Sequence, residues 1–437
     1  MSKFKPSRFN IFYNKEGSDS EIIAYNSFKN SLAIISKNEY EEYKQFECND
    51  IDIKDKQLID DLLDQGILIN KEFDELDIIK SLSLRDRFSK SGLGLTIAPT
   101  MRCNFDCIYC YQKGKRDGQA MNIEIQEKLI EFIKSNLEES KELSVCWYGG
   151  EPLLAISVIE KLSEKIINIC NDKNIKYNSS IVTNGYLLTE EVVNKLIKYK
   201  IKHLQITIDG PEDIHDERRF IINSKKQTFN TIISNIVKIF EITSDISIDI
   251  RINADKKNID RVKEVIEIFK DKGILDKVYC YLGFIETNNG CYEEEACIDY
   301  ENYINENKNF LNKINETNKN DHIDYLFHVT ASCGADRVNS YVIAPDGKIF
   351  KCWSDIGIDK YSIGDLKNEK VDMNNTFAKY LLYDVTIDPN CKDCKIIPIC
   401  MGGCFNHRIN TGWNRCSKFK YDLEEILNKK VKSIEVK

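Results

Sequence analysis

The sequence has no long apolar run, and this absence excludes one large class of protein. No stretch of the 437 residues approaches the ~20 consecutive apolar residues that a membrane-spanning helix needs. The first residues, Met-Ser-Lys-Phe-Lys-Pro, also lack the apolar segment of a secretory signal peptide. We therefore expect a cytoplasmic protein without a membrane partner.

An excess of basic charge is also missing. Lys and Arg number 62 against 70 Asp and Glu, which leaves a formal net charge of −8. Surfaces that bind nucleic acid are basic because they neutralise phosphates, so this balance argues against a nucleic-acid partner. The hydrophobic fraction of 42% and the charged fraction of 30% are typical of a soluble enzyme, and the length suffices for two or three domains.

Cysteine, in contrast, is abundant, with 16 residues in the chain. A reducing cytoplasm does not maintain structural disulfides, so metal or cluster ligation is the simplest use of these thiols. Their spacing supports this reading, because some fall in one short loop near residue 103 and others crowd between residues 333 and 416. The scattered ones are Cys48, Cys146, Cys170, Cys280, Cys291 and Cys297.

The first part of the chain, residues 1–85, reads as a small α+β domain. Its apolar patterns predict strands at 9–13, 21–25 and 67–69, a helix after Ser36 as N-cap, and a second helix at 56–63. The charged segment 79–91 is expected to link this domain to the rest.

From residue 92 to 286, strands and helices alternate. The strands are expected at 93–98, 143–148, 179–183, 203–208, 246–252 and 278–284. Such β/α units predict a parallel sheet with right-handed crossovers, here a partial (β/α)6 version of the TIM barrel. Chemistry in such barrels lies on the loops that follow the strands. Residues 287–330 read as a polar connector, and residues 331–437 as a cysteine-rich domain.

The loop after the first barrel strand carries the spacing Cys103-x3-Cys107-x2-Cys110. A fully ligated 4Fe–4S cluster takes four cysteines, so three leave one iron open to bind the amino and carboxylate groups of a methionine moiety. Such a cluster can deliver an electron to a sulfonium and break a C–S bond. A zinc site or ordinary buried cysteines are the alternatives, but zinc usually has a fourth Cys or His nearby, and none lies near this loop.

With Tyr109 as its aromatic residue, the loop resembles the signature of the radical S-adenosylmethionine (SAM) superfamily. The resemblance implies SAM as cosubstrate and a radical-initiating cluster on the three cysteines. Gly149-Gly150-Glu151-Pro, after the second strand, is similar to the family's GGEP motif, which holds the amino group of SAM. By itself this segment would read as a simple turn.

A third motif follows the fourth barrel strand. Thr207-Ile-Asp209-Gly-Pro and His-Asp-Glu-Arg-Arg219 resemble a family pattern in which a hydroxyl residue and the final Arg contact the carboxylate or ribose of SAM. Arg219 fits by spacing, and Arg218 is its rival. Thr183, after the third strand, is a weaker contact candidate. His215 reads equally as a structural hydrogen-bonding residue or a catalytic one.

The C-terminal cysteines predict metal ligation from their spacing alone, with two zinc sites or a redox dithiol as alternatives. The pattern resembles the SPASM domain of radical SAM maturases, which carries two auxiliary 4Fe–4S clusters and brings the total to three. The resemblance assigns one cluster to Cys391, Cys394, Cys400 and Cys416. It assigns the other to Cys333, Cys352 and Cys404, with an open iron or Cys297 as fourth ligand.

One residue narrows the choice among these relatives. Those that oxidise a sulfatase Cys or Ser have an Asp immediately after the cysteine equivalent to Cys352, whereas this chain has Trp353. Sulfatase maturation is therefore disfavoured.

The layout of residues 1–85 resembles the winged-helix-like peptide-recognition domain (RRE) of ribosomal-peptide (RiPP) maturases, although a cap packing on the barrel would look similar. The chain is thus similar to sactisynthases and ranthipeptide synthases. This implies an oxidoreductase that forms a thioether in a precursor peptide and takes electrons from a flavodoxin or ferredoxin. A carbon–carbon cross-link, an epimerised residue, a radical dehydrogenase acting on a side chain or small molecule, and a non-catalytic cluster- or zinc-binding protein remain alternatives.

Overall fold

The computed structural model describes residues 3–49, 53–115, 118–224, 226–285, 292–318, 326–368, 370–412 and 415–435. Its contacts divide the chain into two compact units. The first comprises Met1–Phe88, His322–Arg337 and Lys379–Lys437, and the second comprises Ser89–Asp321 and Val338–Ala378. In the parts that the structure describes, no helix is long and apolar enough to cross a membrane.

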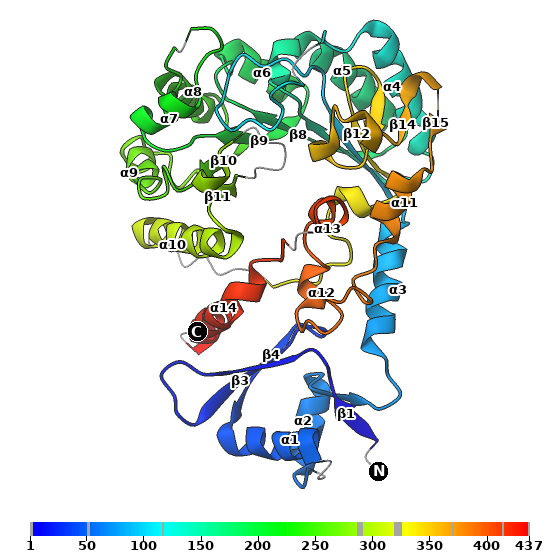
Figure 1. Ribbon diagram of the computed structural model, residues 1–437, viewed down its shortest axis with the longest axis vertical. Coiled ribbons are helices and arrows are strands. Elements are labelled where there is room, and N and C mark those ends of the chain that lie inside the picture. Colours follow the sequence, from blue (N-terminus) through cyan, green and yellow to red (C-terminus); the bar gives the residue numbers. More distant parts are fainter. Residues whose placement is uncertain are drawn as a thin grey trace. The chain divides into compact units, whose positions relative to one another are not determined.

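The second unit is built on a 10-stranded sheet in the order β11-β10-β9-β8-β7-β6-β12-β13-β14-β15 (Figure 1). From β11 to β12 every neighbouring pair is parallel, and the remaining pairs are antiparallel. The strands are β6 Gly92–Ile97, β7 Glu142–Trp147, β8 Lys176–Thr183, β9 Ile201–Thr207, β10 Ser247–Ala254, β11 Val278–Phe284, β12 Ser340–Ile343, β13 Lys348–Phe350, β14 Gly364–Asp365 and β15 Lys370–Val371.

Strands β6 to β11 lie in the sheet in their sequence order, as the alternating pattern predicts, and this mixed α/β arrangement is consistent with a partial barrel. The helices that connect them run along one side of the sheet in Figure 1. They are α4 Ile123–Asn136, α5 Ile156–Asp172, α6 Glu190–Lys198, α7 Glu212–Arg218, α8 Phe229–Ile242 and α9 Glu264–Asp271.

A further helix, α10 Tyr300–Asn318, follows β11. The hydroxyl of Tyr303 donates to the carbonyl of Leu282 at 2.6 Å, and Asn307 accepts from the amide of Leu282 at 2.9 Å. The segment 287–330, expected to be a polar connector, therefore contains a helix of 19 residues. Only a few apolar residues face β11, so the stripe that marks a helix is weak in the sequence.

The first unit contains the antiparallel sheet β2-β3-β4 and the separate pair β1-β5. One face of the three-stranded sheet packs against α1 and α2 through Tyr43 and Leu62, and the other against α14 through Leu427. The strands are β1 Phe4–Pro6, β2 Asn10–Asn14, β3 Glu21–Asn26, β4 Ser31–Ser36 and β5 Leu68–Asn70. The helices are α1 Lys37–Asn49, α2 Lys56–Asp64, α3 Glu75–Arg87, α11 Asn375–Leu382, α12 Ile397–Cys400, α13 Phe405–Asn410 and α14 Phe419–Glu435, with α11 beginning in the second unit.

Two local features of this unit test the sequence analysis. Ser36 caps α1 as expected, because its Oγ accepts from the amide of Glu39 at 3.2 Å while Glu39 accepts from the amide of Ser36 at 2.6 Å. The charged segment 79–91, expected to link this domain to the rest, contains most of helix α3 and the boundary between the two units after Phe88. Its Arg87 is buried and donates to the carbonyls of Tyr380 and Tyr383, both at 2.7 Å.

Candidate functional site

The three-cysteine loop leaves the end of β6 and is fixed by backbone hydrogen bonds to the segment after α7. The amides of Asp106 and Ile108 donate to the carbonyls of Phe220 and Arg218 at 2.9 and 3.1 Å. The amide of Ile222 donates to the carbonyl of Asn104 at 2.9 Å. Cys107 is buried, whereas Cys103 and Cys110 are half-buried. The loop motif and the Arg-Arg motif, 100 or so residues apart in sequence, thus form one structure.

Tyr109 is the residue through which this loop reaches the sheet. Its hydroxyl accepts from Nη1 of Arg219 at 2.7 Å and from Nδ2 of Asn253 at 3.0 Å. Burial raises the pKa of this phenol well above its usual value, so it stays protonated. The expected cofactor contacts Tyr109 and Arg219 therefore lie side by side.

Adjacent arginines at the end of α7 have different surroundings. Arg218 donates from Nε to Asp209 at 3.2 Å and from Nη1 to Asp255 at 2.8 Å, so two carboxylates neutralise it. Arg219 lies near Cys107, whose thiolate raises the pKa of Arg219 against the lowering effect of burial. Arg219, the arginine that the motif spacing predicts, is therefore the one near Cys107.

Glu151 is completely buried, and its carboxylate points into the protein. Oε1 accepts from Oγ1 of Thr183 at 2.8 Å and from the amide of Leu153 at 3.1 Å, while Oε2 accepts from the amide of Asn184 at 2.7 Å. Burial raises the pKa of Glu151 to about 7, against the lowering effect of these hydrogen bonds. In this structure Thr183 orients Glu151, and the carboxylate binds internal donors in the place expected for an ammonium group.

The two glycines of this motif are needed by the chain itself. A Cβ on Gly149, whose φ is +119°, would lie 2.3 Å from the carbonyl oxygen of Thr100. A Cβ on Gly150 would lie 2.3 Å from the carbonyl oxygen of Arg102. The Gly-Gly pair was expected to let a ligand approach the backbone closely, whereas in the structure the entrance of the cysteine loop makes this close approach.

His215 belongs to a chain of hydrogen bonds below this site. Its Nδ1 accepts from the amide of Asp209 at 3.3 Å, and its Nε2 lies 3.1 Å from Oγ1 of Thr228. That hydroxyl donates to the carbonyl of Arg219 at 2.6 Å. Burial lowers the pKa of His215 well below its usual value. The neutral ring joins both ends of α7, which is a structural role.

Thr207, the expected hydroxyl contact, ends β9 and is buried.

The C-terminal cysteines lie in the first unit, except Cys352. Burial raises the pKa of Cys391 and of Cys400, and the nearby Cys394 adds to the rise in both, as Cys416 does for Cys400. Cys404 likewise raises the pKa of Cys333. The structure therefore brings together the four cysteines assigned to one cluster and two of those assigned to the other.

Two features beside these cysteines were missed in the sequence. The pair Gly402-Gly403 has positive φ values, and a Cβ on Gly403 would lie 2.0 Å from the carbonyl oxygen of Arg415. This contact brings Cys416 toward the turn after Cys400. The Gly-Gly pair between Cys400 and Cys404 is the sequence feature that could have predicted this turn. Arg408 is the second feature, a nearly buried cation near Cys391.

An aromatic cluster joins the first cysteine loop to Cys352 within the second unit. Trp353 stacks on Tyr148 with 5.1 Å between ring centroids, and the hydroxyls of Tyr148 and Tyr111 are hydrogen-bonded. Cys110 and Cys352 both raise the pKa of Tyr111, after the larger effect of burial. Cys297 is half-buried in this unit, with Sγ 3.8 Å from the carbonyl of Glu293, and Cys291 lies outside the described residues.

The predicted ligands are all cysteines, and thiolates are the donors that iron–sulfur clusters use. Over the described residues, no three Cys, His, Asp or Glu side chains meet as a mononuclear metal site would require. Cluster ligands bind different irons and lie farther apart. Beside the loop, Nε of Arg219 and Oδ1 of Asp209 are buried without a hydrogen-bond partner in the described part of the chain. These atoms are suited to a polar ligand such as SAM.

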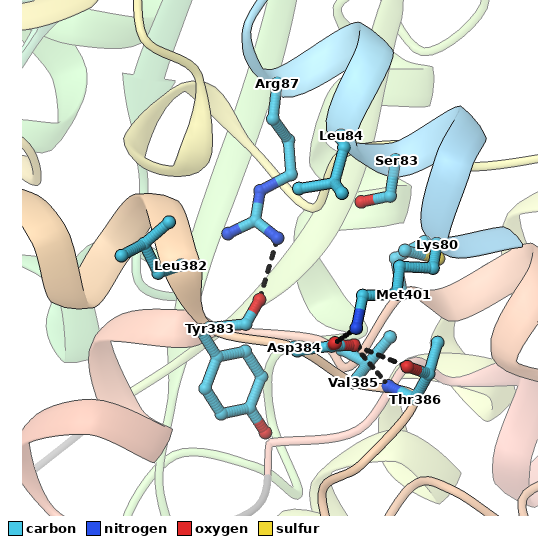
Figure 2. Close-up of a pocket in the computed structure, with 10 residues that line it drawn as sticks. All are labelled: Lys80, Ser83, Leu84, Arg87, Leu382, Tyr383, Asp384, Val385, Thr386 and Met401. Atoms are coloured by element: carbon cyan, nitrogen blue, oxygen red, sulfur yellow. Dashed lines mark hydrogen bonds and ion pairs between the residues drawn. The ribbon is translucent and has the colours of Figure 1, made fainter. Parts of the chain in front are cut away.

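A separate hollow of about 190 Å³ lies in the first unit, between α3 and residues 382–386 (Figure 2). Lys80 and Asp384 form an ion pair of 2.7 Å at its wall, and Arg87 donates to the carbonyl of Tyr383. None of its lining residues belongs to the predicted site, and we assign it no role.

Comparison with known proteins finds a match for part of the second unit. Residues 97–295 match the Radical SAM superfamily. The chain is 24% identical to a cysteine-type anaerobic sulfatase-maturating enzyme of Clostridium perfringens, over 77% of this chain and 92% of that enzyme. It is 25% identical to the radical SAM cyclopropyl synthase TigE of Paramaledivibacter caminithermalis, over 91% of this chain and 86% of TigE.

Among solved structures, Streptococcus suis SuiB bound to the precursor peptide SuiA has a similar fold. The TM-score is 0.54 at 14% identity, and the match covers 93% of this chain and 97% of SuiB.

Proposed function

We propose that this protein, whose residues 97–295 form a radical SAM domain, is an oxidoreductase that modifies a ribosomally made precursor peptide and forms a thioether from a cysteine sulfur to a carbon. The observation that carries the proposal is the breadth of the resemblance. TigE and SuiB match over more than nine-tenths of the chain, and SuiB was solved with a precursor peptide.

In this proposal Cys103, Cys107 and Cys110 hold the radical-initiating cluster, and the other assigned cysteines hold two auxiliary clusters. When bound, a 4Fe–4S cluster with an open iron supplies the electron that cleaves SAM to a 5′-deoxyadenosyl radical. Tyr109 and Arg219 line the loop on the side of the sheet. Gly149, Gly150, Glu151, Thr183, Thr207 and Asp209 complete the proposed SAM surroundings. A flavodoxin or ferredoxin is the expected electron donor in a reducing cytoplasm.

The leader of the precursor is proposed to add as a strand to the sheet β2-β3-β4. In the described residues β4 has a strand on one side only, and its Ile34 side chain is 40% exposed. We expect Ile34→Asp to weaken leader binding by about tenfold, the effect of losing one apolar contact of this size. Fluorescence anisotropy of a labelled leader measures this, and unchanged affinity would remove β4 from the proposal.

The reaction is tested with anaerobically reconstituted protein, dithionite, SAM and each short Cys-rich peptide that sequencing finds encoded near the gene. A thioether gives a loss of two hydrogens and a cysteine that no longer reacts with iodoacetamide. A carbon–carbon cross-link gives the same mass loss but leaves the thiol reactive, whereas epimerisation leaves the mass unchanged. Peptide recovered unmodified while 5′-deoxyadenosine accumulates would contradict peptide maturation.

A matched pair of variants tests the assignment of the initiating loop. Cys103→Ser removes a proposed cluster ligand and is expected to abolish 5′-deoxyadenosine formation. Cys48→Ser changes an exposed cysteine of α1 in the first unit and is expected to change nothing. Equal activity of the two variants would refute the assignment.

Sulfatase maturation is the second candidate, favoured by the Clostridium perfringens relative. The Trp353 side chain, 44% exposed beside Cys352, occupies the place of the Asp that such enzymes have there. We therefore expect no oxidation of a cysteine-type sulfatase peptide under the same conditions.

A further inference from the structure

Arg251 lies on the face of the parallel sheet that is turned away from the helices. In β10 the residues Ile250 and Ile252 are completely buried, while Arg251 between them is half-buried on the opposite face. Its register partners are Thr207 in β9 and Tyr281 in β11. The Arg251 side chain therefore lies on the face of the sheet opposite to Ile250 and Ile252, and β9 and β11 lie on either side of its strand.

The hydrogen-bond partners of Arg251 are all neutral. Nε donates to Oδ1 of Asn253 at 2.8 Å, and Nη2 donates to the carbonyl of Phe284 at 3.3 Å. Among the described residues no carboxylate lies within 4.0 Å of this guanidinium, whereas Arg218 on the same unit has two. A half-buried cation that contacts only neutral acceptors keeps its preference for a carboxylate, which its planar fork binds through two parallel hydrogen bonds.

The neighbouring strand makes room for this side chain. A Cβ on Gly283 would lie 2.5 Å from Nε of Arg251 and 2.6 Å from Oδ1 of Asn253. The guanidinium can lie across β11 only because residue 283 has no side chain. Tyr148 and Tyr281 flank it, and Arg251 lowers the pKa of both phenols against the larger raising effect of burial.

Arg251 is also connected to the cysteine loop. Asn253, which accepts from Arg251, donates from Nδ2 to the hydroxyl of Tyr109 at 3.0 Å. Two hydrogen bonds thus join the guanidinium to the residue between Cys107 and Cys110. A carboxylate bound by Arg251 would be held beside the atoms where the proposed chemistry begins.

We propose that Arg251 binds a carboxylate of the reacting molecules, in the first place that of an Asp or Glu side chain of the peptide substrate. This inference rests on the proposed function and names a substrate class for it, a peptide whose modified residue is acidic or adjoins an acidic group. The methionine carboxylate of SAM has the same chemistry and is the other source.

The test compares Arg251→Met and Arg251→Lys with a control, Arg261→Met. Arg261 is an exposed arginine of the same unit, paired with Asp213 and Glu264. For each protein the SAM dissociation constant and the rate of peptide modification are measured. The peptide is the precursor that the wild-type enzyme modifies, taken as such and with each Asp or Glu replaced by Asn or Gln. Wild-type activity on that precursor tests the proposed function separately.

Arg251→Met is expected to lower kcat/KM for the peptide by about 10- to 100-fold, the effect of losing a charge-assisted hydrogen-bonded pair. Replacing the recognised acid in the peptide is expected to lower it similarly and to add little to Arg251→Met, as coupled partners do. A SAM dissociation constant weakened by the same factor would instead assign the carboxylate to SAM. If the acidic and amide peptides react alike and SAM binds as in the wild type, the inference is overturned.

Discussion

The glycines at 149 and 150 allow the cysteine loop to be tested without touching a cysteine. In Gly150→Ala the new Cβ would start 2.3 Å from the carbonyl oxygen of Arg102 and 2.4 Å from that of Met101. Ordinary contact needs about 3.5 Å, so the loop entrance or the Gly-Gly turn must move by about 1 Å. A displacement of this size costs on the order of 100-fold in rate where reacting groups are held in place. Overpacking of this kind also costs about 1–3 kcal/mol of stability.

The assay is 5′-deoxyadenosine formation by reconstituted enzyme, with iron content and thermal unfolding measured on the same samples. We expect Gly150→Ala to lose about 100-fold in rate while retaining the iron of the auxiliary clusters, because the perturbation is confined to the loop. Gly92→Ala is the matched control, since a Cβ there meets nothing nearer than 3.9 Å.

Gly149→Ala has its own control in Gly118→Ala. Their φ values are +119° and +124°, so both variants carry similar backbone strain, but a Cβ on Gly118 meets nothing within 4 Å. The difference between them therefore isolates the contact with the loop. Equal rates for the members of each pair would refute the argument that these glycines set the position of the cysteines.

Further predictions concern Glu151, His215 and Gly403. Burial raises the pKa of Glu151 from 4.5 to about 7, so its contribution to the free energy of unfolding is present below pH 4.5 and falls by about 3 kcal/mol as pH rises through 7. Glu151→Gln should flatten this part of the stability profile, measured by thermal unfolding between pH 5 and 8. An unchanged slope in the variant would contradict this prediction. His215→Ala removes a buried hydrogen-bonding ring and should lower the free energy of unfolding by about 3 kcal/mol, against less than about 1 for the half-buried His203→Ala. Gly403→Ala should displace Cys416 and lower the iron content by about four atoms per chain, which is one proposed cluster. Gly412→Ala is the control, because Gly412 has a φ of +72° against +71° for Gly403 but open space for a Cβ. An equal loss of iron in the two variants would refute the role of the contact at Gly403.

The barrel strands were predictable because their apolar alternation is strong. Ile248, Ile250 and Ile252 of β10, for example, are all buried on one face. Strand β4 and helices α3 and α10 were missed for the opposite reason. In α3 the buried face consists of Glu75, Ile79, Ser83 and Arg87, three of which are polar. The hydrogen-bond partners of Glu75 and Arg87 come from distant parts of the chain, which a local pattern does not show.

The candidate site was predictable in its cysteines but not in its orientations. Spacing identified the loop and the GGEP-like motif. It could not show that the carboxylate of Glu151 turns inward, because this depends on Thr183 and on the amide of Asn184, which follow a different strand. Nor could a pattern reveal that Gly150 accommodates the backbone of Arg102 in place of a ligand.

Arg218 and Arg219 are the clearest example, because two identical residues adjacent in the sequence have different surroundings in the structure. Arg218 is neutralised by Asp209 and Asp255 and adds little charge to its surroundings. Arg219 has a phenol and the thiol of Cys107 as its neighbours and so keeps its positive charge directed at the cysteine loop. A cysteine binds iron as the deprotonated thiolate, and a buried cation beside Cys107 favours that thiolate, which the proposed cluster needs. Arg218, neutralised by its carboxylates, lies over the ring of Tyr109, whereas Arg219 is the cation placed near Cys107.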